Sequence, residues 1–114
     1  MQDKDNVKNL IEKNLEICNK IYACDTGKVF MQKEDTIVSN NVVFSEFIEL
    51  IPKLKAYGVD IPMDVILQQL KNLIEAYEYN DAMLLADTLK YEINDSLQLY
   101  IEIMEQLKKE NIVI

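Results

Sequence analysis

The chain has 114 residues, the length of a single domain, and we expect residues 1–114 to fold as one helical domain. It carries 20 acidic and 12 basic residues, giving a formal net charge of −8, and it lacks both histidine and arginine. Histidine is the usual general base near neutral pH and the commonest metal ligand, while arginine grips phosphate at two points. We therefore expect no metal, no cofactor and no nucleic-acid partner.

The sequence also suggests where the protein resides. Its first six residues are polar and of mixed charge, unlike a secretory signal, and the longest uninterrupted apolar run, 82–86, is far shorter than the ~20 residues of a membrane span. Cys18 and Cys24 would point to different sides of one helix, so we interpret them as reduced thiols rather than as a redox pair or an intermolecular bridge. We predict a cytoplasmic protein with no membrane partner.

The first helix is predicted over about residues 5–25, because apolar side chains recur there at steps of three and four. Gly27 is a suitable residue to end it. The members of this stripe are Val7, Leu10, Ile11, Ile17, Cys18, Ile21 and Tyr22.

Residues 28–40 follow with two short apolar runs around a polar centre. This pattern suits either a small hairpin or an ordered loop that crosses the end of a bundle. No Asn-Gly or Asp-Gly turn favours the hairpin, so we predict an irregular crossing segment over about 27–40.

The second helix is predicted to begin near Ser39–Asn41 and to close at Gly58. Pro52 lies inside its pattern and lacks the backbone N–H, so we expect a kink or an early end there. The apolar stripe comprises Val43, Phe44, Phe47, Ile48, Ile51 and Leu54.

Two more helices are predicted, over 62–79 and 82–109, joined by a short turn in which Asp81 caps the last helix. So short a connection makes them antiparallel neighbours. Leu70 and Leu89 lie in the middle of their stripes, and we expect both to be buried.

Within the last helix, Asn94-Asp95-Ser96 interrupts the apolar pattern and is expected to bend or locally break it. A second, looser apolar set indicates that this helix is either central or in contact with another subunit. The set is Leu84, Tyr91, Leu99, Ile101 and Ile103.

Together these elements predict an all-α protein, an antiparallel up-and-down four-helix bundle with an irregular crossing segment. The last helix exceeds the preceding one by roughly ten residues at 1.5 Å per residue, so its apolar end needs cover from the first helix or from a second molecule. We predict a protein partner or a homo-oligomer, such as a homodimer, at this end. The candidate partner-binding residues are Leu97, Tyr100, Ile101, Met104 and Leu107.

Carboxylates are the only abundant side chains of a catalytic kind. Four gather on the last predicted helix, but carboxylate bundles that hold iron also need histidine. Asp87, next to the stripe residue Ala86, is the one candidate for an inward-facing carboxylate, although a solvated face or a cap is favoured. The six tyrosines indicate either rings packed in the core or a protein-binding surface. We predict no catalytic residue.

A Glu-Ala pair at 75–76, the polar turn Asn80-Asp81 and the apolar helix start at 84–87 carry a resemblance. Over roughly residues 70–100 the chain resembles the C-terminal helical hairpin of flagellin-specific export chaperones. That family forms cytoplasmic antiparallel bundles that hold the disordered end of flagellin. The same stretch resembles uncharacterised small helical domains of low-GC Gram-positive bacteria, which we prefer as a description and which implies no activity.

These patterns favour a non-enzymatic helical interaction module: an adaptor, a chaperone-like protein or an oligomerising protein. The alternative is a bundle that binds a small molecule, or catalyses a reaction, with carboxylate, tyrosine or lysine groups. A concave, partly polar pocket in the structure would favour this alternative.

Overall fold

Four helical segments make up the part of the chain that the computed structural model describes, namely residues 4–23 and 26–113, with side chains of 26–33 left aside. They are α1 (Lys4–Tyr22), α2 (Thr26–Lys55), α3 (Met63–Glu78) and a long final helix. This final helix consists of α4 (Ala82–Thr88), a π-helical stretch η1 (Leu89–Ile93) and α5 (Asn94–Lys109). No strand occurs among these residues, and the all-α prediction is confirmed.

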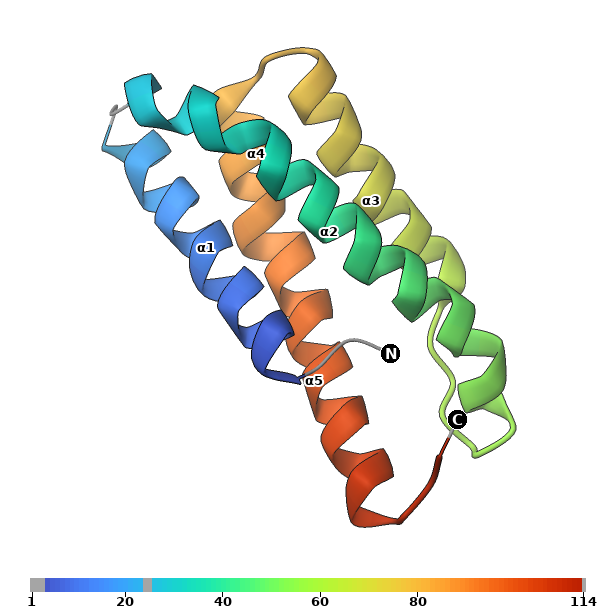
Figure 1. Ribbon diagram of the computed structural model, residues 1–114. Helices are drawn as coiled ribbons and strands as arrows, with labels where there is room; N and C mark the ends of the chain where they lie inside the picture. Colours follow the sequence, from blue (N-terminus) through green and yellow to red (C-terminus); the bar gives the residue numbers. More distant parts are fainter. Residues whose placement is uncertain (1–3, 24–25, 114) are drawn as a thin grey trace.

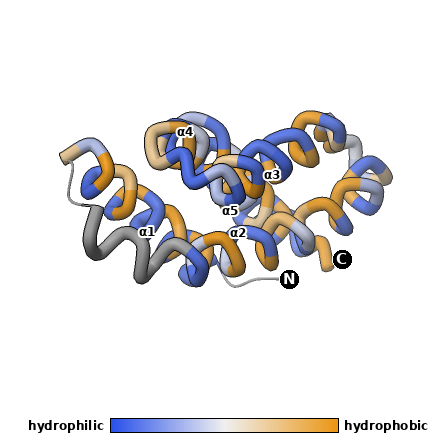
Figure 2. The backbone as a smooth tube through the Cα atoms, turned by 90° about the horizontal axis from the view of Figure 1, so that it is seen from above, coloured by the Kyte–Doolittle hydropathy of each residue, from blue (hydrophilic) through white to orange (hydrophobic). Residues whose placement is uncertain are grey.

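The helices run alternately up and down an elongated body of 45 × 25 × 18 Å. Helix α2 crosses the molecule diagonally, so that its first half lies beside α1 and its second half beside α3 (Figure 1). Helix α1 packs on α4, η1 and α5, while α3 packs on α4 and η1. Hydrophobic and hydrophilic residues alternate along the backbone, as they do in amphipathic helices (Figure 2).

The predicted irregular segment over 27–40 is wrong, and so is a helix start near Ser39–Asn41. Helix α2 begins at Thr26 and continues through this region without a break. Its buried face extends back through Asn40 and Thr36, four residues apart, which are polar. Apolar periodicity therefore does not reveal the first part of α2, because its buried positions there are polar.

Of the kink or early end predicted at Pro52, the early end does not occur, because α2 continues for three residues beyond it to Lys55. Gly58 then takes a positive φ of 81°. The Val59 N–H donates to the Leu54 carbonyl at 3.1 Å, and the Gly58 N–H to the Lys55 carbonyl at 3.1 Å. This is a Schellman motif, which satisfies carbonyls that a helix end leaves unpaired.

Asparagines close α3 and α5 in the same way. Asn80, after α3, has a φ of 53°, and Asn111, after α5, has a φ of 55°. Asp81 then caps α4, as predicted, since its carboxylate accepts a hydrogen bond from the Leu84 N–H at 3.0 Å. Asparagine tolerates this left-handed conformation better than most residues.

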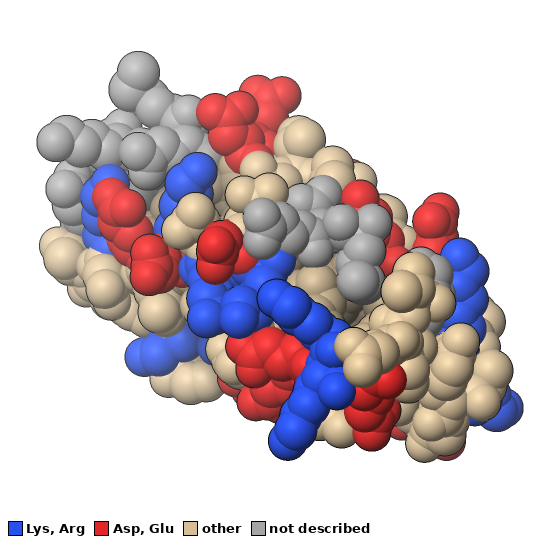
Figure 3. Space-filling model, turned by 60° about the horizontal axis from the view of Figure 1, so that its bottom comes forward, with Lys and Arg blue, Asp and Glu red and all other residues tan. Residues whose placement is uncertain are grey.

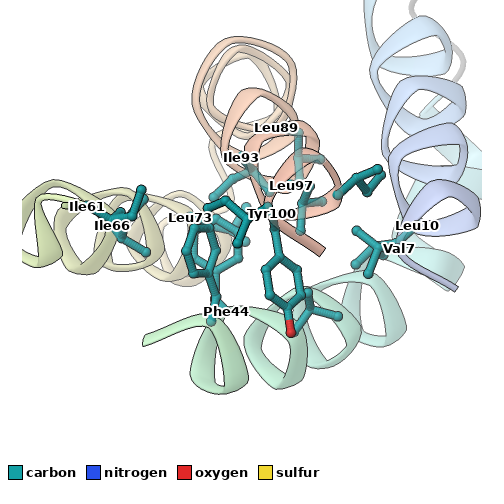
Figure 4. Close-up of a cluster of buried hydrophobic side chains, with 14 of the residues drawn as sticks. Val7, Leu10, Phe44, Ile61, Ile66, Leu73, Leu89, Ile93, Leu97 and Tyr100 are labelled. Carbon is teal, nitrogen blue, oxygen red and sulfur yellow. The ribbon is translucent and has the colours of Figure 1, made fainter. Parts of the chain in front are cut away.

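The core lies where α2 crosses the long final helix. Tyr100 reaches from α5 toward α2, near Phe44 (Figure 4), and its ring stacks on that of Phe47 with centroids 4.8 Å apart. On the other side of α5, Val7 and Leu10 of α1 cover the same cluster. Leu89 is fully buried as predicted, whereas Leu70 is only partly buried.

The π-helical stretch follows from the spacing of the buried residues. The buried positions of the final helix occur as adjacent pairs that recur at steps of three or four, except for one step of five across η1. The pairs are Leu85 and Ala86, Thr88 and Leu89, Ile93 and Asn94, Ser96 and Leu97, Tyr100 and Ile101, and Ile103 and Met104. A π-turn, whose hydrogen bonds span five residues, keeps both sides of that step facing the core. The predicted bend or break at Asn94-Asp95-Ser96 does not occur, because these residues are the first turn of α5, and the departure from α-helix lies in the five residues before them.

A buried cluster of three asparagines joins three helices. Asn14 of α1 and Asn40 of α2 exchange two amide hydrogen bonds of 3.0 Å, and Asn14 also donates to Asn94 of α5 at 2.9 Å. Asn40 donates in addition to the Thr36 carbonyl at 2.8 Å, and Asn94 to the Ile11 carbonyl at 3.4 Å. Asn14 and Asn40 are inaccessible to solvent, so the protein itself satisfies these amides.

Deleting Tyr91 is expected to be tolerated, because it shortens the step of five to four and lets the final helix become α-helical throughout. Deleting Gln98, which is also exposed, is the matched control. It rotates one part of α5 by about 100° relative to the other, which should abolish folding. Circular dichroism during thermal unfolding would compare the two, and equal damage by both deletions would contradict this explanation of η1.

Replacing Asn14 with alanine should lower the free energy of unfolding by about 2–4 kcal/mol, because it leaves the side-chain oxygens of Asn40 and Asn94 without the amide that donates to them. Replacing all three asparagines with leucine removes the unpaired groups along with the network. We therefore expect the triple variant to be more stable than Asn14→Ala in urea unfolding. The reverse order would contradict this explanation, because it would show that unpaired amides cost less than replacing the network.

Candidate interaction surface

The five predicted partner-binding residues lie inside the bundle. Tyr100 and Leu97 are inaccessible to solvent, and Ile101, Met104 and Leu107 are buried as well. Helix α1 packs along α5, and the chain itself buries the five side chains that we expected a second molecule to cover. These side chains therefore pack within the chain, and a docking surface has to be sought elsewhere.

A groove of about 360 Å³ lies between α1 and α2. Leu10 and Val43, both buried, contribute to its lining, whereas Val38 and Val42 of α2 are 56% and 46% exposed. Farther along α1, Lys13 also belongs to a smaller extension of the groove, of about 210 Å³, that includes Glu16, Ile17, Asp35 and Thr36. The groove and its extension together follow the α1–α2 contact for several helical turns.

The polar part of the groove bears on the enzymatic alternative. Asn6, Asn9 and Ser39 line it, and Lys13 is the one charged residue among the described residues of its lining. It is thus the concave and partly polar pocket that the alternative called for. However, no carboxylate and no tyrosine lies among its described lining residues, so Lys13 is the only one of the alternative's three kinds of group that is found there.

A second hollow of about 250 Å³ lies at the opposite end of α2, beside the end of α5. Its apolar lining comes from the α2–α3 connection, from α5 and from the residues after α5. These residues are Tyr57, Val59, Ile103, Leu107 and Ile112, with Glu102, Gln106 and Glu110 completing the lining.

Asp87, the candidate inward-facing carboxylate, is exposed, in agreement with the favoured interpretation. Its Oδ1 accepts a hydrogen bond of 2.5 Å from the Tyr22 hydroxyl, and this bond raises the pKa of Tyr22 to about 12. The Lys90 ammonium lies 5.5 Å from the centroid of the Tyr22 ring and 5.3 Å from that of Tyr91. These contacts fasten the end of α1 to α4 and η1.

Further polar contacts of the final helix connect it to α3. The Asn72 amide donates to Glu92 at 2.9 Å, and the Ser96 hydroxyl donates to Gln69. Among the described residues, no three histidine, cysteine, aspartate or glutamate side chains form a group that could hold a metal ion. None of the helices in that part of the chain combines the length and apolarity needed to cross a membrane.

Cys18 is buried between α1 and α4, where its thiol donates to the Ala86 carbonyl at 3.3 Å. Burial disfavours the thiolate and raises the pKa of this thiol to about 11. Cys18 therefore behaves as a small core residue, as the sequence indicated. Cys24 lies outside the described residues.

Comparison with known proteins assigns no role to the groove or to the hollow. The chain matches no protein-family model, and neither the curated proteins nor the solved structures contain a similar chain at a significant level. The resemblance to export chaperones and to helical domains of low-GC Gram-positive bacteria stays a prediction.

Sequence reasoning missed the residues that line the α1–α2 groove. Val38 and Val42 are four residues apart, which is the spacing of one helix face. That signal was available, but it was divided between a segment predicted to be irregular and the first turn of a predicted helix.

Alkylation of Cys18 by iodoacetamide is expected to be about 100-fold slower in the folded protein than in urea at pH 8. The thiolate is the nucleophile, and folding raises the pKa of this thiol from its ordinary value of 9.0 to about 11. A Cys24→Ser background isolates this thiol, and Cys18→Ala supplies the blank for mass spectrometry. Equal rates in the two states would show that Cys18 is accessible.

The raised pKa of Cys18 also makes the folded state less stable at alkaline pH. Below pH 9 both folded and unfolded thiols are protonated, and between about pH 9 and 11 only the unfolded one ionises. The stability of the Cys24→Ser protein should thus fall more steeply over this range than that of the variant that also lacks Cys18.

Proposed function

We propose that the protein is a non-enzymatic helical interaction module whose α1–α2 groove binds an amphipathic helix of a partner protein. The observation that carries the proposal is the pair Val38 and Val42, left half exposed beside a buried apolar floor. An amphipathic helix places apolar side chains on one face at three- and four-residue steps, and a groove between two helices accepts such a face.

The polar groups beside the valines support the same proposal. Asn6, Asn9 and Ser39 can bond polar side chains at the edge of a docked helix, while Leu10 and Val43 contact its apolar face. Interfaces combine an apolar centre and a polar rim in this manner. Holding a segment of another protein in the cytoplasm is also what the resemblance to export chaperones implies.

The other candidate functions find less support. A homodimer through the last helix would have to use residues that α1 and α2 already cover. An enzymatic or small-molecule-binding bundle would need carboxylate, tyrosine or lysine groups to converge in a partly polar pocket. Of these groups the described lining of the α1–α2 groove presents Lys13 alone, and the second hollow, which has Tyr57, Glu102 and Glu110, is mainly apolar.

Val42→Lys should abolish partner binding, because it places a charge against the apolar face of the docked helix. Val65→Lys on α3 is the matched control, since Val65 is 47% exposed and Val42 46%. Peptides selected from a displayed helical library on the wild-type protein would be measured against both variants by fluorescence anisotropy. We expect a loss of roughly tenfold or more for Val42→Lys alone.

Urea unfolding provides the control for folding. Both variants should have the same unfolding midpoint as the wild type, because each valine lies at the surface. If the library yields no peptide, or if the selected peptides bind Val42→Lys as well as the wild type, the α1–α2 groove is not the partner site.

A further inference from the structure

The second hollow is built by two helix ends that meet. Helices α2 and α5 both finish at the same end of the molecule, with the α2–α3 connection beside the end of α5 (Figure 1). Each helix closes with a Schellman motif, in which the Val59 N–H bonds the Leu54 carbonyl and the Ile112 N–H bonds the Leu107 carbonyl. These bonds turn Val59 and Ile112 back onto the core, where both are partly buried.

An apolar space remains between these two turns. Ile103 and Leu107 of α5 are buried beneath it, and Tyr57 forms a wall that is 50% exposed. The hollow of about 250 Å³ is open to solvent and has far more apolar than polar lining. It therefore offers one large apolar side chain a place to leave water.

The charged side chains that line this space are acidic. Among the described residues Glu102 and Glu110 are its charged lining residues, and the Gln106 amide donates a hydrogen bond of 3.0 Å to the Glu110 carboxylate, whereas the lysines in the last turns of α2 and α5 are outside the lining. The carboxyl-terminal ends of α2 and α5 add their partial negative charge. Lys108 and Lys109 of the last turn offset the dipole of α5 but do not line the hollow.

Farther from the hollow, lysine and acidic side chains lie close together on this end of the molecule (Figure 3). Lys4, for example, pairs with Glu105 at 3.3 Å. A cationic ligand is therefore favoured by the two lining glutamates and by the net charge of −8, which attracts cations at longer range, rather than by a broad acidic surface.

We propose that this hollow is a second binding site, which takes a short protein segment with one large apolar side chain flanked by lysine or arginine. The apolar side chain enters between Tyr57 and Ile112, and the flanking cations face Glu102 and Glu110. The site is separate from the α1–α2 groove and does not depend on the function proposed for it.

A second copy of the chain fits this end less well. A stable dimer buries about 800 Å² on each partner. The backbone measures 25 × 18 Å across its long axis, so a dimer through one end would have to bury almost all of that end. A short segment with a single anchoring side chain needs no such area.

The test uses a fluorescein-labelled peptide with a central phenylalanine between lysines, bound to the full chain and followed by anisotropy. We expect saturable binding that weakens with salt and is lost when the phenylalanine becomes alanine or the lysines become glutamates. Glu102→Lys/Glu110→Lys should weaken binding by about tenfold or more. Glu12→Lys/Glu78→Lys, which changes the net charge equally at exposed sites elsewhere, should weaken it far less.

Tyr57→Ala provides a second test that does not depend on charge. Because Tyr57 is half exposed, the variant should fold, and it should bind the peptide more weakly. Absence of binding, or equal weakening by the two charge-reversal pairs, would overturn the proposal. So would loss of binding in Val42→Lys, which would place the peptide in the α1–α2 groove, or a doubled mass in light scattering, which would identify a second copy as the occupant.

Discussion

The hydrogen-bonded amides of Asn14, Asn40 and Asn94 constrain the arrangement of this bundle more than any other contact. Apolar side chains can exchange neighbours at modest cost, but a buried amide that loses its partner loses the hydrogen bonds it had in water as well. One asparagine comes from each of α1, α2 and α5. Only one rotation and one axial position of each helix satisfies all three, so the network selects a single register, as buried asparagines do in coiled coils.

The irregularities of the bundle are consistent with that selection. Asn94 sets the phase of α5, whereas Leu85 and Ala86 set the phase of α4 against α1 and α3. The two phases differ by one residue, and η1 accommodates the difference without breaking the helix. The diagonal course of α2 has a similar origin, since Asn40 ties its first half to α1 while Phe47 stacks on Tyr100 of α5 farther along.

Much of the fold could be predicted from the sequence, because α3, the turn at Asn80 and the cap at Asp81 depend on local signals. The start of α2 could not, because its buried face turns polar at Thr36 and Asn40, and only the amides across the core explain why polar residues lie there. The predicted partner-binding residues are buried rather than exposed, and the sequence could not show this for a related reason. A stripe shows that a face is apolar but not which helix covers it, and α1 and α2 together cover Tyr100 and its neighbours.

The bond between Asn14 and Asn94 joins residues 80 positions apart in the chain. During synthesis on the ribosome, α1 emerges first, yet it cannot complete its packing until α5 has followed. The antiparallel pair formed by α3 and α4 needs only residues that are close in sequence, so it can assemble before α1 packs on the final helix. Helix α2 can cover part of the apolar face of α1 early, but the part that packs on α4, η1 and α5 stays uncovered until those residues have been made, and such exposed apolar surface favours aggregation.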